Sequence, residues 1–305
     1  MTNNRGKNTA ASVRDRLLSL ARERGEDFQL LLTQYGLERL LYRLSQSDYR
    51  ERFILKGAML FILWSEQPHR PTRDVDFLGF GDSSEAGLQK IFHELCELSI
   101  EDDGLRLMRD SVQVEAIRDD TEYGGMRVKL FGDLAGARVP IQADIGFGDA
   151  VTPEAKEIDF PTLLDSPAPR LRVYPRETVV SEKYQALVNL GMANSRMKDF
   201  YDLWVIAREF HFDGLTLSGA IRNTFSRRHT PLPEDIPSGL TSEFYEDTQK
   251  NTQWNAFLRK GMLVTSPASL AEVCLLLETF LGPPTQTLVQ DKDFKATWEP
   301  GGPWR

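Results

Sequence analysis

The hydrophobic periodicity of the chain changes along its length, and this change is the feature that most constrains the fold. Residues 12–47 carry leucines at spacings of three and four, which predicts two helices, the second broken at Tyr35-Gly36. In residues 74–80, and again in segments between 112 and 147, apolar and polar residues largely alternate, as is typical of strands. From Glu177 onward the spacing is helical again. We therefore predict an α+β fold: a mixed or antiparallel sheet flanked by helices, followed by a mainly α-helical lobe.

The individual elements follow from the same patterns. Strands are expected at 112–117, 126–131 and 138–147, and helices at 84–99, 178–191, 199–210, 216–226 and 266–281. The segment 150–176 contains five prolines and is expected to connect two domains on the surface. We place a sheet domain with N-terminal helices at 1–165 and a helical domain at 166–305. Trp298 and Trp304, in a tail without periodicity, are expected to dock onto a surface.

Composition excludes several classes of protein. No apolar run approaches the roughly 20 residues of a membrane-spanning helix, and the polar N-terminus does not resemble a signal peptide. A cytoplasmic location without a membrane partner is expected. Two distant cysteines predict neither a disulfide framework nor a zinc site. A net charge of −8 argues against general nucleic-acid coating, so an RNA would need local basic groups. Such groups are Arg170, Arg172 and Arg176, and Arg222, Arg227, Arg228 and His229.

Two carboxylates one residue apart are the first candidates for chemistry. Strand alternation places Asp74 and Asp76 on one face. Asp144 is a third candidate, because its strand alternates with Val139, Ile141, Ala143 and Ile145 on the opposite face. Carboxylates from neighbouring strands suit a hard cation, Mg²⁺ or Mn²⁺, in phosphoryl transfer. By itself, an Asp-x-Asp pair is more often a solvated strand end.

A glycine-containing turn, Lys56-Gly57-Ala58, lies upstream of the acid pair and precedes a helix-like run. Backbone N–H groups at such a turn bind phosphates, and Gly57 would allow close approach. Alternatively, a lone glycine between apolar residues is a packing point.

A second group of polar residues lies in the helical half. Lys183 falls inside the apolar arc of its helix, where it either pairs with a structural acid or points at a triphosphate. Asp199 and Asp202 follow at helical spacing, close to Arg196 and Lys198. Asp199 is a site residue or a helix N-cap, and Asp202 is placed to orient Lys183 or Arg196.

Five segments in this order and spacing resemble the AbiEii/AbiGii toxin family, which belongs to the DNA polymerase β-type nucleotidyltransferases and includes the mycobacterial MenT toxins. The resemblance covers about residues 50–210. The segments are 53–60, 73–77, 142–149, 181–183 and 196–203.

The resemblance implies a metal-dependent nucleotidyltransferase, the toxin of a toxin–antitoxin pair with an AbiEi-like antitoxin. Such a toxin moves a nucleoside monophosphate from an NTP to an RNA acceptor, in characterised relatives the 3′ end of tRNA. By carry-over, Asp74 and Asp76 would hold the metal with Asp144 as third acid, which would also help to deprotonate the acceptor hydroxyl. Lys183 would stabilise the leaving pyrophosphate. The remaining nucleotide-binding residues would be Lys56, Gly57, Ala58, Arg196, Lys198, Asp199 and Asp202.

The chain departs from the family at the turn. Where many members have a Ser or Thr, this chain has Ala58-Met59, so a hydroxyl contact to phosphate is lost. This departure leaves a second hypothesis open, a non-catalytic scaffold that binds nucleotide or a partner. A third is a nucleotidyltransferase that acts on a small molecule.

Overall fold

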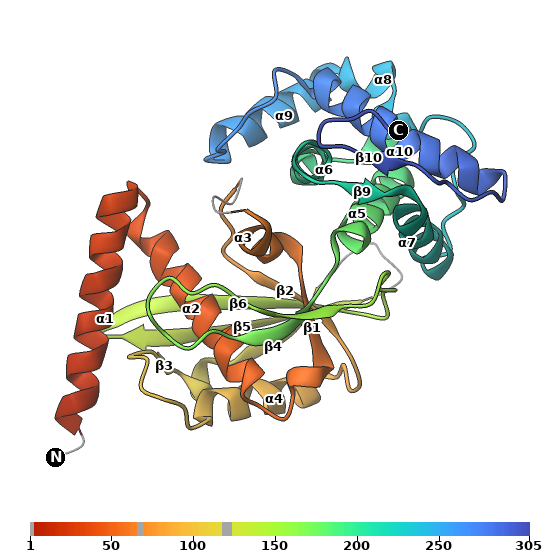
Figure 1. Ribbon diagram of the computed structural model, residues 1–305. Helices are drawn as coiled ribbons and strands as arrows, with labels where there is room; N and C mark the ends of the chain where they lie inside the picture. The colour runs from red at the N-terminus through yellow and green to blue at the C-terminus, as the bar shows by residue number, and fades with distance from the viewer. Residues whose placement is uncertain (1–2, 66–69, 118–123) are drawn as a thin grey trace. The chain divides into compact units, whose positions relative to one another are not determined.

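The computed structural model describes residues 3–65, 70–117 and 124–305, with side chains from residue 9 onward (Figure 1). Contacts within the chain divide it into two compact units. The first unit comprises Met1–Glu66, Pro71–Gly148 and Lys156–Val173, and the second comprises Gln67–Arg70, Asp149–Ala155 and Tyr174–Arg305.

An eight-stranded mixed sheet forms the centre of the first unit, and its strands follow the order β3-β5-β6-β2-β1-β8-β7, with β4 beside β5. Strand β2 is antiparallel to β1 and parallel to β6. The expected strands are confirmed, but the segment predicted as a connection contributes β7 and β8 to the sheet. The strands are β1 (Phe53–Lys56), β2 (Val75–Gly79), β3 (Arg106–Leu107), β4 (Gln113–Ile117), β5 (Gly125–Leu134), β6 (Ala137–Phe147), β7 (Lys156–Asp159) and β8 (Arg170–Val173).

Four helices belong to the first unit: α1 (Asn3–Arg24), α2 (Phe28–Ser45), α3 (Leu60–Trp64) and α4 (Glu85–Glu97). The predicted break at Tyr35-Gly36 is wrong, since α2 continues through both residues. A Cβ atom at Gly36 would lie 2.7 Å from Cγ1 of Val139 on β6. This glycine therefore brings the helix close to the apolar face of the sheet, and packing outweighs the helix-breaking tendency of glycine.

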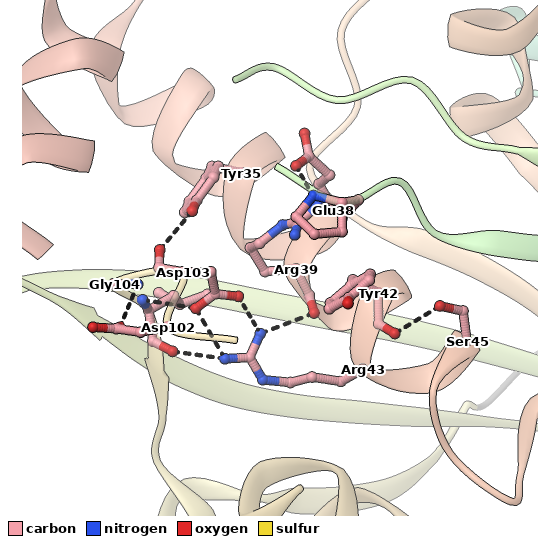
Figure 2. Close-up of polar contacts among 11 residues, drawn as sticks. Tyr35, Glu38, Arg39, Tyr42, Arg43, Ser45, Asp102, Asp103 and Gly104 are labelled. Atoms are coloured by element: carbon pink, nitrogen blue, oxygen red, sulfur yellow. Dashed lines mark hydrogen bonds and ion pairs between the residues drawn. The ribbon is translucent and has the colours of Figure 1, made fainter. Parts of the chain in front are cut away.

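Helix α2 is also held by buried charges (Figure 2). Arg43 donates to both carboxylate oxygens of Asp103, at 2.8 and 3.2 Å, and the Tyr35 hydroxyl donates to the Asp103 carbonyl at 2.6 Å. Arg39, fully buried, pairs with Glu38 at 2.7 Å and donates to the Pro167 carbonyl at 3.0 Å. These contacts join α2 to two loops that are distant in sequence.

The second unit is mainly helical. The four predicted helices are present, α8 and α9 were not predicted, and α10 runs beyond its predicted end through Pro283 and Pro284. Buried Thr285 and Leu288 follow those prolines, so packing maintains the last turns although each proline removes a backbone donor. The helices are α5 (Arg176–Leu190), α6 (Met197–Glu209), α7 (Gly214–Arg227), α8 (Ser242–Tyr245), α9 (Thr248–Lys260) and α10 (Leu270–Val289).

The tail after α10 docks as predicted. Strand β10 (Thr297–Trp298) pairs with β9 (Phe212–Asp213), and the buried Trp298 indole donates to the Ala207 carbonyl at 2.6 Å. The Trp304 indole donates to the Phe280 carbonyl at 2.9 Å. Among the described residues, no helix combines the length and apolar character needed to cross a membrane.

Candidate functional site

A row of charged side chains crosses the sheet of the first unit. Asp76 is the register partner of Lys56 on β1 and of Asp144 on β6. Asp144 in turn lies opposite Arg127 on β5, which lies opposite Glu115 on β4. Register partners project from the same face with Cβ atoms about 5 Å apart. The five strands β1, β2, β6, β5 and β4 therefore present one continuous row, which we call the charged row.

Burial shows why these strands hold the row in place. In β6 the odd-numbered residues from Val139 to Ile145 are buried, whereas Gln142 and Asp144 are half-buried. In β2, Asp76 is the single half-buried residue among four buried ones. A one-residue slip in pairing would move the buried set to the other face. The prediction that Asp144 lies opposite the buried face of its own strand is confirmed, and the strand register adds that Asp76 lies beside it.

Asp144 is held by a salt bridge to Arg127. The guanidinium donates through Nε at 2.8 Å to one carboxylate oxygen and through Nη2 at 2.6 Å to the other. The amide of Gln142 donates to Oδ1 of Asp144 at 3.2 Å. Both partners are only partly exposed, with 33% and 17% of their side chains accessible. The salt bridge raises the pKa of Arg127. Sequence reasoning missed Arg127, although its alternation with Lys129 on β5 is a signal.

Gly57 lies directly against the Asp76 carboxylate. Its φ is +76°, in the left-handed region, and a Cβ atom there would be 1.9 Å from Oδ2 of Asp76. Any side chain at this position would therefore displace the acid. The turn begins a three-residue 3-10 helix, Gly57–Met59, which continues into the five-residue α3. The phosphate-binding role of Lys56, Gly57 and Ala58 stays a prediction, but Gly57 now has a steric reason to be glycine.

Asp74 lies just before β2, and its Oδ1 accepts a hydrogen bond from the Thr72 hydroxyl at 2.7 Å. Mg²⁺ is commonly held by one or two carboxylates together with substrate phosphates, which Asp74 and Asp76 match. Among the described residues, no three acidic, His or Cys side chains are grouped to hold a metal ion. Because Asp144 is bound to Arg127, its role as a third ligand stays a prediction, and the carboxylate pair is the part of the set that fits a metal.

The second unit contains a separate cluster of charges around Lys183. Its ammonium group is 2.5 Å from Oδ1 of Asp199 and 3.0 Å from Oδ2 of Asp202. Asp202 is fully buried and also accepts from Arg70, through Nε at 2.7 Å and Nη2 at 2.8 Å. Two cations and two anions thus balance one another. The expectation that Asp202 orients Lys183 is confirmed.

Burial acts to lower the pKa of Lys183, but Asp199 and Asp202 outweigh it and raise the pKa overall. Lys183 is therefore expected to act as a charged ammonium group at neutral pH rather than as a base. Asp199 is not an N-cap: α6 begins after Arg196, and Asp199 lies in its first turn with its carboxylate on Lys183. Arg70 was missed by sequence reasoning, since nothing local indicates a partner 132 positions away.

Two further predicted nucleotide-binding residues, Arg196 and Lys198, lie at the start of α6. The backbone N–H of Arg196 donates to the buried Asn194 side chain at 2.8 Å, and Lys198 is exposed on the first turn of α6. The structure thus brings Lys183, Asp199 and Asp202 into one cluster in the second unit. The acids Asp74, Asp76 and Asp144 and the turn at Lys56, Gly57 and Ala58 belong to the first unit.

Three of the arginines noted in the sequence, Arg170, Arg172 and Arg228, form ion pairs with acids. Arg170 pairs with Glu157 at 3.1 Å, and Arg172 lies 3.5 Å from Glu51. In the second unit, Arg228 pairs with Asp149 at 2.9 Å and lies 3.4 Å from Glu182. Arg176 stacks on Phe210, 4.0 Å from the ring centre. These arginines thus give weaker support to a polyanionic acceptor than their spacing indicated.

The fold defines the class of protein. A candidate nucleotidyltransferase from H. pylori shares it with a TM-score of 0.51 and 15% identity, covering 88% of this chain and 100% of that one. JHP933 from Helicobacter pylori shares it with a TM-score of 0.51 and 15% identity, over 87% and 95% of the two chains. The chain therefore has a nucleotidyltransferase-type fold. No curated protein sequence matches it.

A sequence model described as nucleotidyl transferase AbiEii toxin, type IV toxin–antitoxin system, matches residues 39–290. The chain belongs to this family, and the resemblance to AbiEii is confirmed. It is accordingly a nucleotidyltransferase-family toxin of a type IV toxin–antitoxin system, with a nucleotide substrate and an antitoxin partner.

Proposed function

We propose that the protein transfers a nucleoside monophosphate from an NTP to the 3′ end of an RNA, with tRNA as the acceptor that the resemblance to MenT toxins implies. The observation that carries the proposal is the close packing of Gly57 on Asp76, with Asp144 in register beside that acid. A glycine turn against one carboxylate and a second carboxylate on the next strand suit a phosphoryl group and an attacking hydroxyl.

Each group of residues in the proposed site has its own role. Asp74 and Asp76 would hold Mg²⁺ or Mn²⁺, which when bound neutralises phosphate charge. Backbone N–H groups at the turn that begins with Gly57 bind the phosphates without the missing hydroxyl. Asp144 accepts the proton of the acceptor hydroxyl once substrate binding loosens its salt bridge to Arg127.

Lys183 is proposed to stabilise the charge on the departing pyrophosphate. Its raised pKa supports this role, because the ammonium group keeps its positive charge at neutral pH. Asp199 and Asp202 hold Lys183 in one orientation. Arg196 and Lys198 complete the nucleotide site in this proposal. The proposed antitoxin is AbiEi-like.

The test is transfer by the purified protein. Labelled NTPs, one at a time, are supplied with Mg²⁺ or Mn²⁺ and total tRNA, and label is followed into RNA. We expect Asp76→Asn to lower transfer by at least about a thousandfold, since removing one essential charged group from a phosphoryl-transfer site costs about 4 kcal/mol or more. Chelation of the divalent ion should abolish transfer.

The matched control is Asp110→Asn, because the Asp110 side chain is 98% exposed in the same unit. This variant should transfer label at the wild-type rate. A small-molecule acceptor is the second candidate function, favoured by the ion-paired arginines, and is tested with a metabolite extract in place of tRNA. Label in neither pool, with NTP binding intact, would establish the non-catalytic scaffold instead.

A further inference from the structure

A pocket of about 300 Å³ lies in the first unit beside the charged row. Residues from three places line it: the first turns of α2, the residue before Asp74, and the adjoining parts of β5 and β6. Its volume is at the lower end of the range of small-molecule sites, about 300–1,000 Å³. None of the residues assigned above to the metal or the phosphates lines it.

The wall of the pocket touches the charged row directly. Gln142, which lines the pocket, donates from its amide nitrogen to Asp144 at 3.2 Å. Arg73, on another side, immediately precedes Asp74. One lining side chain thus contacts the carboxylate that the proposed function assigns to the acceptor hydroxyl.

The polar groups of the pocket suit a nucleobase with one phosphate. Gln29 and Gln142 supply carboxamides, which can both donate to and accept from a base edge, while Leu30 and Ile141 supply apolar surface. Within the described parts of the chain, neither the Gln29 carboxamide nor the guanidinium of Arg73 hydrogen-bonds to another residue. Guanidinium groups bind phosphate oxygens through paired donors.

The charge balance distinguishes an RNA end from an NTP. Lys129 also lines the pocket, but its ammonium group is 2.5 Å from Glu115, which neutralises it. Phe131 lies beneath Arg138, whose guanidinium carbon is 3.5 Å from the ring centre. Arg73 is thus the cation available to a ligand. One guanidinium matches the single charge of a phosphodiester and leaves most of a triphosphate uncompensated.

We propose that this pocket, lined by Gln29, Arg73 and Gln142, binds the 3′-terminal nucleotide of the RNA acceptor. The inference rests on the proposed function and extends it by naming the acceptor subsite. The terminal base lies between the carboxamides, its 5′-phosphodiester lies on Arg73, and its ribose hydroxyl faces Asp144.

Binding of a 5′-fluorescein-labelled CCA trinucleotide to the full chain, followed by fluorescence anisotropy without NTP, tests the inference. Gln29→Trp fills the pocket from an exposed helix position, and Arg73→Gln removes its available cation. Each variant should weaken binding about tenfold or more, Arg73→Gln through loss of a charged hydrogen bond and Gln29→Trp because its ring occupies the pocket. Both should bind NTP as the wild type does.

Two control variants separate the pocket from general effects. Gln89→Trp makes the same change at an exposed position on α4 that does not line the pocket, and Arg106→Gln makes the same charge change at an exposed position on β3. Both should bind the trinucleotide within about twofold of wild type. Circular dichroism confirms that each variant is folded.

The outcomes keep the inference and the proposed function apart. If wild-type protein does not bind the trinucleotide, or if Gln29→Trp and Arg73→Gln bind it as wild type does, the pocket is not the acceptor site, whatever the transfer assay shows. The inference would also be overturned if NTP displaced the trinucleotide and the Asp76→Asn variant bound NTP with the same affinity as the wild type. Pocket-dependent binding without label transfer would retain the subsite and refute the transferase activity.

Discussion

Asp202→Asn should destabilise the second unit strongly, because Asp202 is the fully buried anion between Arg70 and Lys183. The substitution preserves shape and removes one negative charge. The wild-type cluster balances two cations against Asp202 and Asp199, so the variant leaves two cations with one anion. Arg70 and Lys183 cannot escape readily to solvent, since 13% and 17% of their side chains are exposed.

The expected loss of folding stability in this variant follows from the contacts of Asp202. Three charged contacts at 2.7, 2.8 and 3.0 Å converge on the Asp202 carboxylate. Removing one partner of a buried ion pair costs about 3–5 kcal/mol. Because Asp199 still compensates Lys183, we expect the lower end, about 3 kcal/mol, a large part of the typical 5–15 kcal/mol stability of a folded domain.

Urea denaturation followed by tryptophan fluorescence measures this loss. Four of the five tryptophans, Trp204, Trp254, Trp298 and Trp304, belong to the second unit, so the signal reports mainly on that unit. The midpoint should fall by about 1 M or more, given slopes of about 1–3 kcal/mol per molar urea.

The matched control is Asp293→Asn, whose wild-type side chain is 63% exposed and 3.8 Å from Lys295. An exposed pair of this kind contributes little, so the variant should unfold within about 0.5 kcal/mol of wild type. If Asp202→Asn loses less than about 1 kcal/mol, the cluster does not hold the second unit together and the reasoning fails.

Three further predictions concern the turn, the lysine and the cysteines. Gly57→Ala should lower the free energy of unfolding by at least about 1–2 kcal/mol from the left-handed backbone alone, and by more because of the contact with Asp76. The control is Gly136→Ala, where φ is +80° and nothing lies within 4 Å. In the same denaturation assay it should show only the loss that comes from the backbone. The folded pKa of Lys183 is raised above its ordinary 10.5, so the stability that its ion pairs contribute is fully present below pH 10.5 and lost as pH rises through the folded pKa. The stability difference between wild type and Lys183→Met should therefore be constant from pH 7 to about 10 and shrink above that range, and a decline beginning near neutral pH would contradict this. Burial raises the pKa of Cys274 to about 12 and that of Cys96 to about 11, so iodoacetamide at pH 8 should modify the urea-unfolded chain much faster than the folded one, and equal rates would show that the thiols are accessible.

The sequence allowed the predicted acids of the sheet to be placed because strand alternation is a local property. A strand that buries Val139, Ile141 and Ala143 must expose Asp144 on its other side, whatever its partners are. The choice of which strands pair with one another is not a local property. That Asp144 lies beside Asp76 and opposite Arg127 depends on which strands become neighbours, and hydrophobic pattern alone leaves that choice open.

The errors in the helices have a related cause. Gly36 and Pro283 each weaken a helix intrinsically; a break was predicted at Tyr35-Gly36, and the last helix was predicted to end at residue 281, before Pro283. In the structure the surrounding packing decides, since Gly36 fits against β6 and buried residues follow Pro283 and Pro284 in α10. Lys183 was predictable as a lysine that needs a partner, whereas Arg70 was not.

The partition of the chain has a consequence for how the protein can be produced and dissected. The second unit takes Gln67–Arg70 and Asp149–Ala155 from within the stretch that otherwise builds the first. During synthesis, Arg70 therefore emerges long before Asp202, its partner 132 residues later, and Asp149 long before Arg228. A gene fragment ending near residue 173 would express these segments without their counterparts. A single proteolytic cut near residue 173 would likewise leave Arg70 and Asp149 on a different piece from Asp202 and Arg228.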